Sequence, residues 1–131
     1  MRTTKKEDYA IVLMTALAKT EGYTSLRTIA EDFHLPYPFL KQIANDLVNA
    51  ELVESKGGAT GGYKLSRSAE EISWKDIVLA VEGEPKFVDC LSQGGEQCPS
   101  HNVCPSARAW KVLRGSIMKA MDEIKLSKFV K

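Results

Sequence analysis

The stretch SLRTIAEDFHLPYPFLKQIANDLVNAELVESKGGATGGYKL, residues 25–65, decides the fold of this chain. Apolar residues recur at helical spacing from Ser25 to Phe33, and again from Pro38 to about Ala50. Proline suits the first turn of a helix, where its missing N–H is not needed. Two helices joined by so short a turn are typical of a helix-turn-helix motif.

A glycine-rich hairpin follows these two helices. Residues 52–55 and 63–65 are strand-like, and the loop between them spans residues 56–62 and contains four glycines, Gly57, Gly58, Gly61 and Gly62. A hairpin directly after the second helix of the motif is typical of a wing. The alternative is an ordinary surface hairpin on a helical domain that does not bind DNA.

Helices are predicted on both sides of this stretch. Residues 5–19 form an amphipathic helix before it, and Ser73 with Asp76 forms a capping-box-like start of a helix that ends at Gly83. From Ser106 onward a long helix is expected, with apolar residues three and four apart. This apolar stripe packs either on its own domain or, as we favour, against a second copy of the chain; it comprises Trp110, Leu113, Ile117, Ala120 and Ile124.

The predicted fold class is therefore mainly α with a small β wing. We expect a winged helix-turn-helix DNA-binding domain over residues 1–83, a cysteine-containing loop over residues 84–105, and a dimerisation helix over residues 106–131.

Bulk charge does not identify a partner. The formal net charge is +1, and residues 1–65 hold as many acidic as basic residues, so any DNA binding depends on where the basic residues lie. No apolar run approaches the roughly 20 residues of a membrane-spanning helix. The first residues also lack the pattern of a secretory signal. We therefore expect a cytoplasmic protein with no membrane partner.

The three cysteines, Cys90, Cys98 and Cys104, fall in one segment in the pattern C-x7-C-x5-C. A structural zinc site usually has closer C-x2-C pairs. Soft thiolates favour zinc, copper or an iron–sulfur cluster, and each usually has a fourth ligand. His101 in the same loop is one candidate, and Asp8 from a dimer partner is another. The cysteines could instead sense oxidation directly or be buried as small hydrophobes.

The chain resembles the Rrf-type winged helix-turn-helix regulators, whose IscR-, NsrR- and RirA-like branches bind iron–sulfur clusters. The resemblance covers essentially the whole chain. It is carried by the cysteine segment and by four other groups of residues: Met1-Arg2-Thr3-Thr4-Lys5 with Asp8-Tyr9-Ala10, Leu40-Lys41-Gln42-Ile43, Leu52-Val53, and Gly61-Gly62-Tyr63-Lys64-Leu65.

The resemblance implies a homodimer that binds double-stranded, palindromic operator DNA. It also implies a [4Fe-4S] or [2Fe-2S] cluster on Cys90, Cys98 and Cys104. The IscR-like branch has a histidine three residues after the last cysteine, where this chain has Ala107. The cysteine spacing is closer to the RirA-like branch, and Asp8 lies where the NsrR-like branch takes a carboxylate from the partner subunit. The fourth ligand is therefore Asp8, His101, solvent or a small thiol, unless the cluster is incomplete.

The same resemblance assigns eleven residues to DNA. The start of the recognition helix would face the major groove, the wing would reach the minor groove or backbone, and the N-terminal and second-helix residues would contact phosphates. In that order they are Pro38, Phe39, Lys41 and Gln42; Lys56 and Thr60; and Arg2, Thr4, Lys5, Ser25 and Arg27.

The expected function is transcription regulation through a cluster that senses iron supply, nitric oxide or redox state. The first alternative is a winged-helix regulator whose cysteines bind zinc or sense oxidation without a cluster. The second is a dimeric adaptor that binds protein. An enzyme is not expected, because the sequence has no recognisable nucleophilic arrangement or phosphate-binding loop.

Overall fold

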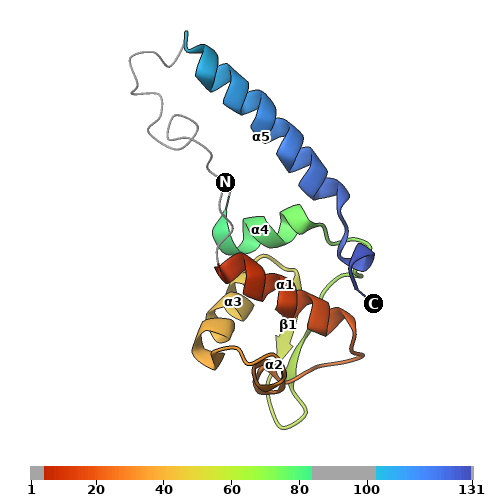
Figure 1. The fold of residues 1–131 in the computed structure, drawn as a ribbon. Helices are drawn as coiled ribbons and strands as arrows, with labels where there is room; N and C mark the ends of the chain where they lie inside the picture. Colours follow the sequence, from red (N-terminus) through yellow and green to blue (C-terminus); the bar gives the residue numbers. More distant parts are fainter. Residues whose placement is uncertain (1–4, 84–102, 131) are drawn as a thin grey trace.

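The computed structural model describes residues 5–83 and 103–130 (Figure 1). Five α-helices and a two-stranded antiparallel sheet make up this part of the chain, which confirms the predicted mainly α fold with a small β wing. The elements in order are α1 (Lys5–Ala18), α2 (Leu26–Asp32), α3 (Tyr37–Asn49), β1 (Val53–Lys56), β2 (Gly62–Leu65), α4 (Trp74–Glu82), α5 (Pro105–Glu123) and the short 3-10 helix η3 (Leu126–Lys128).

The core lies between α1, α3 and α4, with α2 packed against α3. Each of these helices buries residues at the three- and four-residue spacing that its sequence predicts. Helix α3, for example, buries Leu40, Ile43 and Leu47 completely, while the opposite face stays exposed. The fixed core of this helix therefore determines which polar residues face outward.

The predicted start of α4 is confirmed. The Ser73 side chain accepts a hydrogen bond from the Asp76 backbone N–H at 3.0 Å, and the Asp76 carboxylate accepts one from the Ser73 N–H at the same distance. This reciprocal capping box satisfies two N–H groups that would otherwise lack partners at the helix start. Aspartate thus replaces the usual glutamate without loss of the motif.

The wing is attached to the segment that precedes α2. Strands β1 and β2 pair with Ser55 opposite Tyr63, and Tyr63 also exchanges two backbone hydrogen bonds of 2.9 Å with Thr24. Strand β2 comes very close to this segment, since a Cβ atom on Gly62 would lie 2.6 Å from the Thr24 carbonyl carbon. Strand β2 is therefore held on two sides, by β1 and by Thr24.

The long helix expected from Ser106 is α5, which has 19 residues and does not fill the whole segment assigned to the dimerisation helix. Helix α5 ends at Glu123, and the chain then turns back onto the winged-helix core. The Ile124 carbonyl accepts a hydrogen bond from the Trp74 N–H, and the Leu126 N–H donates one to the Ile72 carbonyl, both at 2.8 Å. Leu126 is fully buried. Backbone pairing with residues distant in sequence replaces the last helical turns.

We name this C-terminal segment, residues 124–130, the tail. Figure 1 shows α5 reaching the core at its tail end, while its N-terminal end projects away from the helices of the core. Among the described residues, no helix combines the length and apolar character needed to cross a membrane.

Replacing Phe129 by alanine is expected to lower the free energy of unfolding by about 1–2 kcal/mol, because its partly buried ring packs edge-on against Trp74. The two ring centroids are 5.6 Å apart. Urea unfolding of both proteins measures the change, and Lys128→Ala, at an exposed position in the same segment, is the control. Equal stability of the Phe129 variant and the wild type would show that the tail does not strengthen the core.

Candidate nucleic-acid interface

The exposed face of α3 is the strongest candidate for base contacts. Gln42 lies on this face, and so does Lys41. Asn45 and Asn49 continue it at the next helical turns, and both are exposed. Asparagine can pair with adenine through two hydrogen bonds, as glutamine can. These two residues were not among the predicted DNA contacts, although their spacing of three and four from Gln42 and Asn45 could have identified them.

Pro38 and Phe39, both expected to contact DNA at the start of the recognition helix, differ from each other in burial. Pro38 is exposed in the first turn, as predicted. Phe39 is partly buried, and its ring contacts Tyr9 of α1 edge-on with centroids 5.3 Å apart. The structure therefore gives Phe39 a packing contact that orients α3 on α1.

Lys41 points toward the wing. Its Nζ donates a hydrogen bond to the Tyr63 hydroxyl at 2.9 Å and lies 5.5 Å from the centre of that ring. The hydrogen bond to Tyr63 is the main cause that raises the pKa of Lys41 above its ordinary value, so the ammonium group is charged at neutral pH. A residue predicted to contact a guanine is thus bonded to the wing.

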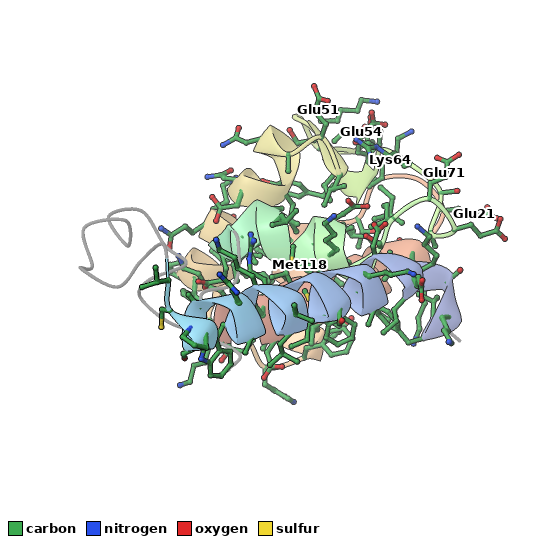
Figure 2. The ribbon with its side chains drawn as sticks, turned by 90° about the horizontal axis from the view of Figure 1, so that it is seen from above. Glu21, Glu51, Glu54, Lys64, Glu71 and Met118 are labelled. Atoms are coloured by element: carbon green, nitrogen blue, oxygen red, sulfur yellow. The ribbon has the colours of Figure 1, made fainter. Side chains whose placement is uncertain are left out.

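The wing carries two lysines beside one aromatic ring. The Nζ atoms of Lys56 and Lys64 lie 5.6 Å and 4.9 Å from the centre of the Tyr23 ring. Lys64 also forms an ion pair of 3.2 Å with Glu54, and Figure 2 shows these two side chains together on the wing. Thr60 is exposed in the hairpin loop. Lys56 and Thr60 were predicted from the sequence. Lys64 and Tyr23 were not, because the grouping of these side chains depends on how the hairpin folds.

Helix α2 also places a cation next to an aromatic ring. The Arg27 guanidinium lies 4.3 Å from the centre of the Tyr37 ring, at the start of α3. Ser25 is the exposed N-cap residue of α2, and its side chain makes no capping hydrogen bond. Its hydroxyl can therefore serve a phosphate. Lys5 is exposed at the start of α1, while Arg2 and Thr4 lie outside the described residues.

Two of the four predicted metal ligands are described. Asp8 is exposed in the first turn of α1, and Cys104 is the partly exposed N-cap residue of α5. Cys90, Cys98 and the alternative ligand His101 lie outside the described residues. Within residues 5–83 and 103–130, no three histidine, cysteine or acidic side chains come together as a metal site.

The family comparison covers nearly the whole chain. The sequence model of the Rrf2 family, described as iron-dependent transcriptional regulators, matches residues 3–131. The chain is 32% identical to the regulator CymR of Bacillus subtilis, over 96% of this chain and 87% of CymR. It is also 32% identical to the regulator IscR of Photorhabdus laumondii, over 99% of this chain and 79% of IscR.

Solved structures give the same result. CymR of B. subtilis, described as its global cysteine regulator, has a TM-score of 0.76 at 29% identity, covering 99% of this chain and 96% of the CymR chain. IscR of T. potens has a TM-score of 0.76 at 32% identity, covering 97% of this chain and 84% of that chain. The fold, the exposed face of α3, the wing and these similarities agree: the chain belongs to the Rrf2 family and is a DNA-binding transcriptional regulator rather than an enzyme.

Proposed function

We propose that this regulator binds a palindromic operator as a homodimer in the cytoplasm, and that an iron–sulfur cluster on Cys90, Cys98 and Cys104 controls its affinity for DNA. The observation that carries the DNA-binding part is the exposed polar face of α3 beside the lysines of the wing. On this surface Gln42 and Asn45 would contact base edges, while Lys56, Lys64 and Arg27 would contact phosphates.

The exposed apolar side chains of α5 are an argument for the proposed homodimer. Helix α5 buries only Ala107 and Met121 against its own chain, while Val112 and Leu113 are 72% and 45% exposed. Exposed apolar side chains on a long helix are typical of a surface that a second copy covers. The N-terminal end of α5, where Cys104 lies, projects away from the core of its own chain (Figure 1), and Asp8 of the partner subunit would complete the proposed site there.

The donor set fits an iron–sulfur cluster. Thiolates are the usual ligands of such clusters, and the Cys104 side chain is partly exposed and makes no capping hydrogen bond, so its sulfur is available to iron. A bound cluster would supply a redox-sensitive link between the cysteine segment and α5. The chain is as similar to CymR, described as a global cysteine regulator, as it is to IscR, so the alternative stays open in which the thiols bind zinc or sense oxidation without a cluster.

The chain offers a path from α5 to the DNA surface. The tail connects the end of α5 to Ile72 and Trp74, at the start of α4. Helix α4 packs in turn on α1 and α3. A change in the position of α5 would therefore shift the support on which the recognition helix rests.

One experiment tests both parts of the proposal. The protein is purified without oxygen and assayed for iron and acid-labile sulfide. Its affinity is then measured for a duplex that it selects from a randomised DNA pool, before and after the cluster is removed by a chelator. We expect iron and sulfide in the protein and a change in affinity of roughly 5–150-fold, the usual range of coupling between two sites. The role of the cluster would be refuted if the protein contains neither iron nor sulfide after attempted reconstitution and its affinity for the duplex is the same before and after chelator treatment.

Replacing Gln42 by alanine is expected to cost about 1–3 kcal/mol of binding free energy at one base pair of the selected duplex, because a bidentate contact to adenine would be lost. Binding to duplexes with each base pair changed in turn measures the effect. Glu51→Ala, at an exposed position beyond α3, serves as the control and should leave the profile unchanged. An equal loss on unrelated DNA would show that Gln42 does not contact a base.

A further inference from the structure

The contact between Lys41 and Tyr63 joins the two elements that face DNA. Lys41 belongs to α3 and Tyr63 to β2, and the hydrogen bond between their side chains is 2.9 Å long. The lysine side chain is exposed, whereas Tyr63 is only 8% exposed. Without the hydrogen bond the Lys41 side chain would be free to move, whereas the Tyr63 side chain is held by its burial.

The fixed partner is held by its backbone as well as by burial. Tyr63 pairs with Ser55 of β1 on one side and with Thr24 on the other, where two hydrogen bonds of 2.9 Å form a bridge. The Tyr63 ring and its hydroxyl are therefore held in place relative to the wing and to the segment before α2. A side chain of α3 that bonds to this hydroxyl fixes α3 relative to the wing.

We propose that Lys41 is a positioning residue that sets the geometry between the recognition helix and the wing, and that it acts through Tyr63 rather than by contacting a base. This inference rests on the proposed binding of operator DNA. The ammonium group lies over the wing tyrosine, while the neighbouring exposed residues Gln42 and Asn45 have no such contact with the wing.

The energetic reason is preorganisation. DNA must be contacted by α3 and the wing at the same time, so freedom between the two elements is lost on binding. The contact removes part of that freedom before binding occurs. Its loss should weaken binding to the operator as a whole and should leave the preference at each base pair unchanged.

A double-mutant cycle with Lys41→Met and Tyr63→Phe tests this inference. Tyr63→Phe keeps the buried ring and removes only the hydroxyl group. Affinity is measured, at fixed salt, for the duplex that the wild type selects from a randomised pool. We expect each single variant to bind about fivefold more weakly, the effect of one lost hydrogen bond. The double variant should bind about as well as the weaker single variant, because both changes break the same contact.

A second measurement separates positioning from base contact. Single base-pair variants of the duplex give a preference profile for each protein. If Lys41 only positions the two elements, each of the variants Lys41→Met and Tyr63→Phe should lower the affinity for every duplex by the same factor. Lys41→Arg, which keeps a charged donor, should retain most of the wild-type affinity. Lys41→Met also removes a positive charge. The strength of the contact between Lys41 and Tyr63 is therefore measured by the coupling free energy of the double-mutant cycle, not by the affinity loss of Lys41→Met alone.

Three outcomes would overturn the inference. They are a changed preference at one base pair in Lys41→Met, wild-type affinity in Tyr63→Phe, and additive losses in the double variant. Lys41 is exposed, so its variants should fold, and the base-pair profile of Lys41→Met decides the matter even without Tyr63→Phe. If the wild type selects no duplex at all, the proposed function fails instead.

Discussion

Replacing Cys104 by alanine is expected to abolish the cluster and to make DNA affinity independent of iron. The wild type should change affinity roughly 5–150-fold between the two states, and the variant should show a ratio near one. The proposed cluster would then keep only two of its three protein thiolates, those of Cys90 and Cys98. Iron and sulfide assays, together with affinity for the selected duplex, measure both effects.

The structure makes this variant informative because it separates metal binding from folding. The Cys104 side chain is partly exposed and makes no capping hydrogen bond, so alanine should leave α5 and its stability almost unchanged. Ser106→Ala, two residues away at an exposed position, is the matched control. A Cys104→Ala protein that keeps iron, sulfide and the full change in affinity would refute the proposed ligand.

The same assay distinguishes the alternatives. If the cysteines bind zinc, the wild type should contain zinc and no labile sulfide. If they respond to oxidation alone, the metal-free protein should change its affinity after treatment with peroxide, and Cys104→Ala should tell whether this thiol takes part.

Most of the winged-helix architecture could be predicted from the sequence, because it follows from local patterns. Apolar spacing in α3 predicts the burial of Leu40, Ile43 and Leu47, and therefore also the opposite polar face. The capping box at Ser73 and Asp76 is likewise a short-range signal. These features depend on residues within one or two helical turns, so the sequence contains all the necessary information.

The backbone pairing that follows α5 could not be predicted in this way. Ile124 continues the apolar stripe of the helix, and the tail contains no glycine or proline that would end it. The helix ends because the backbone of Ile124 and Leu126 pairs with residues 72–74, which are distant in sequence. Similarly, the bond between Lys41 and Tyr63 joins residues 22 positions apart, and it forms only once the wing is placed beside α3.

The candidate metal site was predictable only as a set of donors. The spacing of Cys90, Cys98 and Cys104 gives the number of thiols and their position before α5. A fourth ligand from a partner subunit depends on the dimer, which local patterns in one chain do not encode. Asp8 in its exposed position on α1 therefore remains a prediction.

Replacing Gly62 by alanine should lower the free energy of unfolding by about 3–4 kcal/mol, because two costs add. The φ angle of Gly62 is 147°, a conformation that residues with side chains rarely adopt. The added Cβ would also lie 2.6 Å from the carbonyl carbon of Thr24, far inside normal contact distance. The overlap is hard to relieve, because it involves the Thr24 backbone and a Cβ atom attached directly to the backbone of β2.

The change should affect DNA binding beyond its effect on stability. Relief of the overlap requires β2 to move away from Thr24, which breaks the bridge between Thr24 and Tyr63 and displaces the hydroxyl that Lys41 contacts. The folded fraction of the variant should therefore bind the selected duplex at least about tenfold more weakly, because several wing contacts shift together. Urea unfolding and binding titrations, corrected for the folded fraction, measure the two effects.

Two other glycines of the wing separate the cost of backbone strain from the cost of the steric overlap. Gly58 has a φ angle of 91° and open space around its Cβ position, so Gly58→Ala should lose only about 1–2 kcal/mol from backbone strain. Gly57 has neither a positive φ angle nor a close neighbour, so Gly57→Ala should be nearly neutral. If all three variants are equally stable, β2 is not held against Thr24, and the wing is not fixed to the segment before α2 in this way.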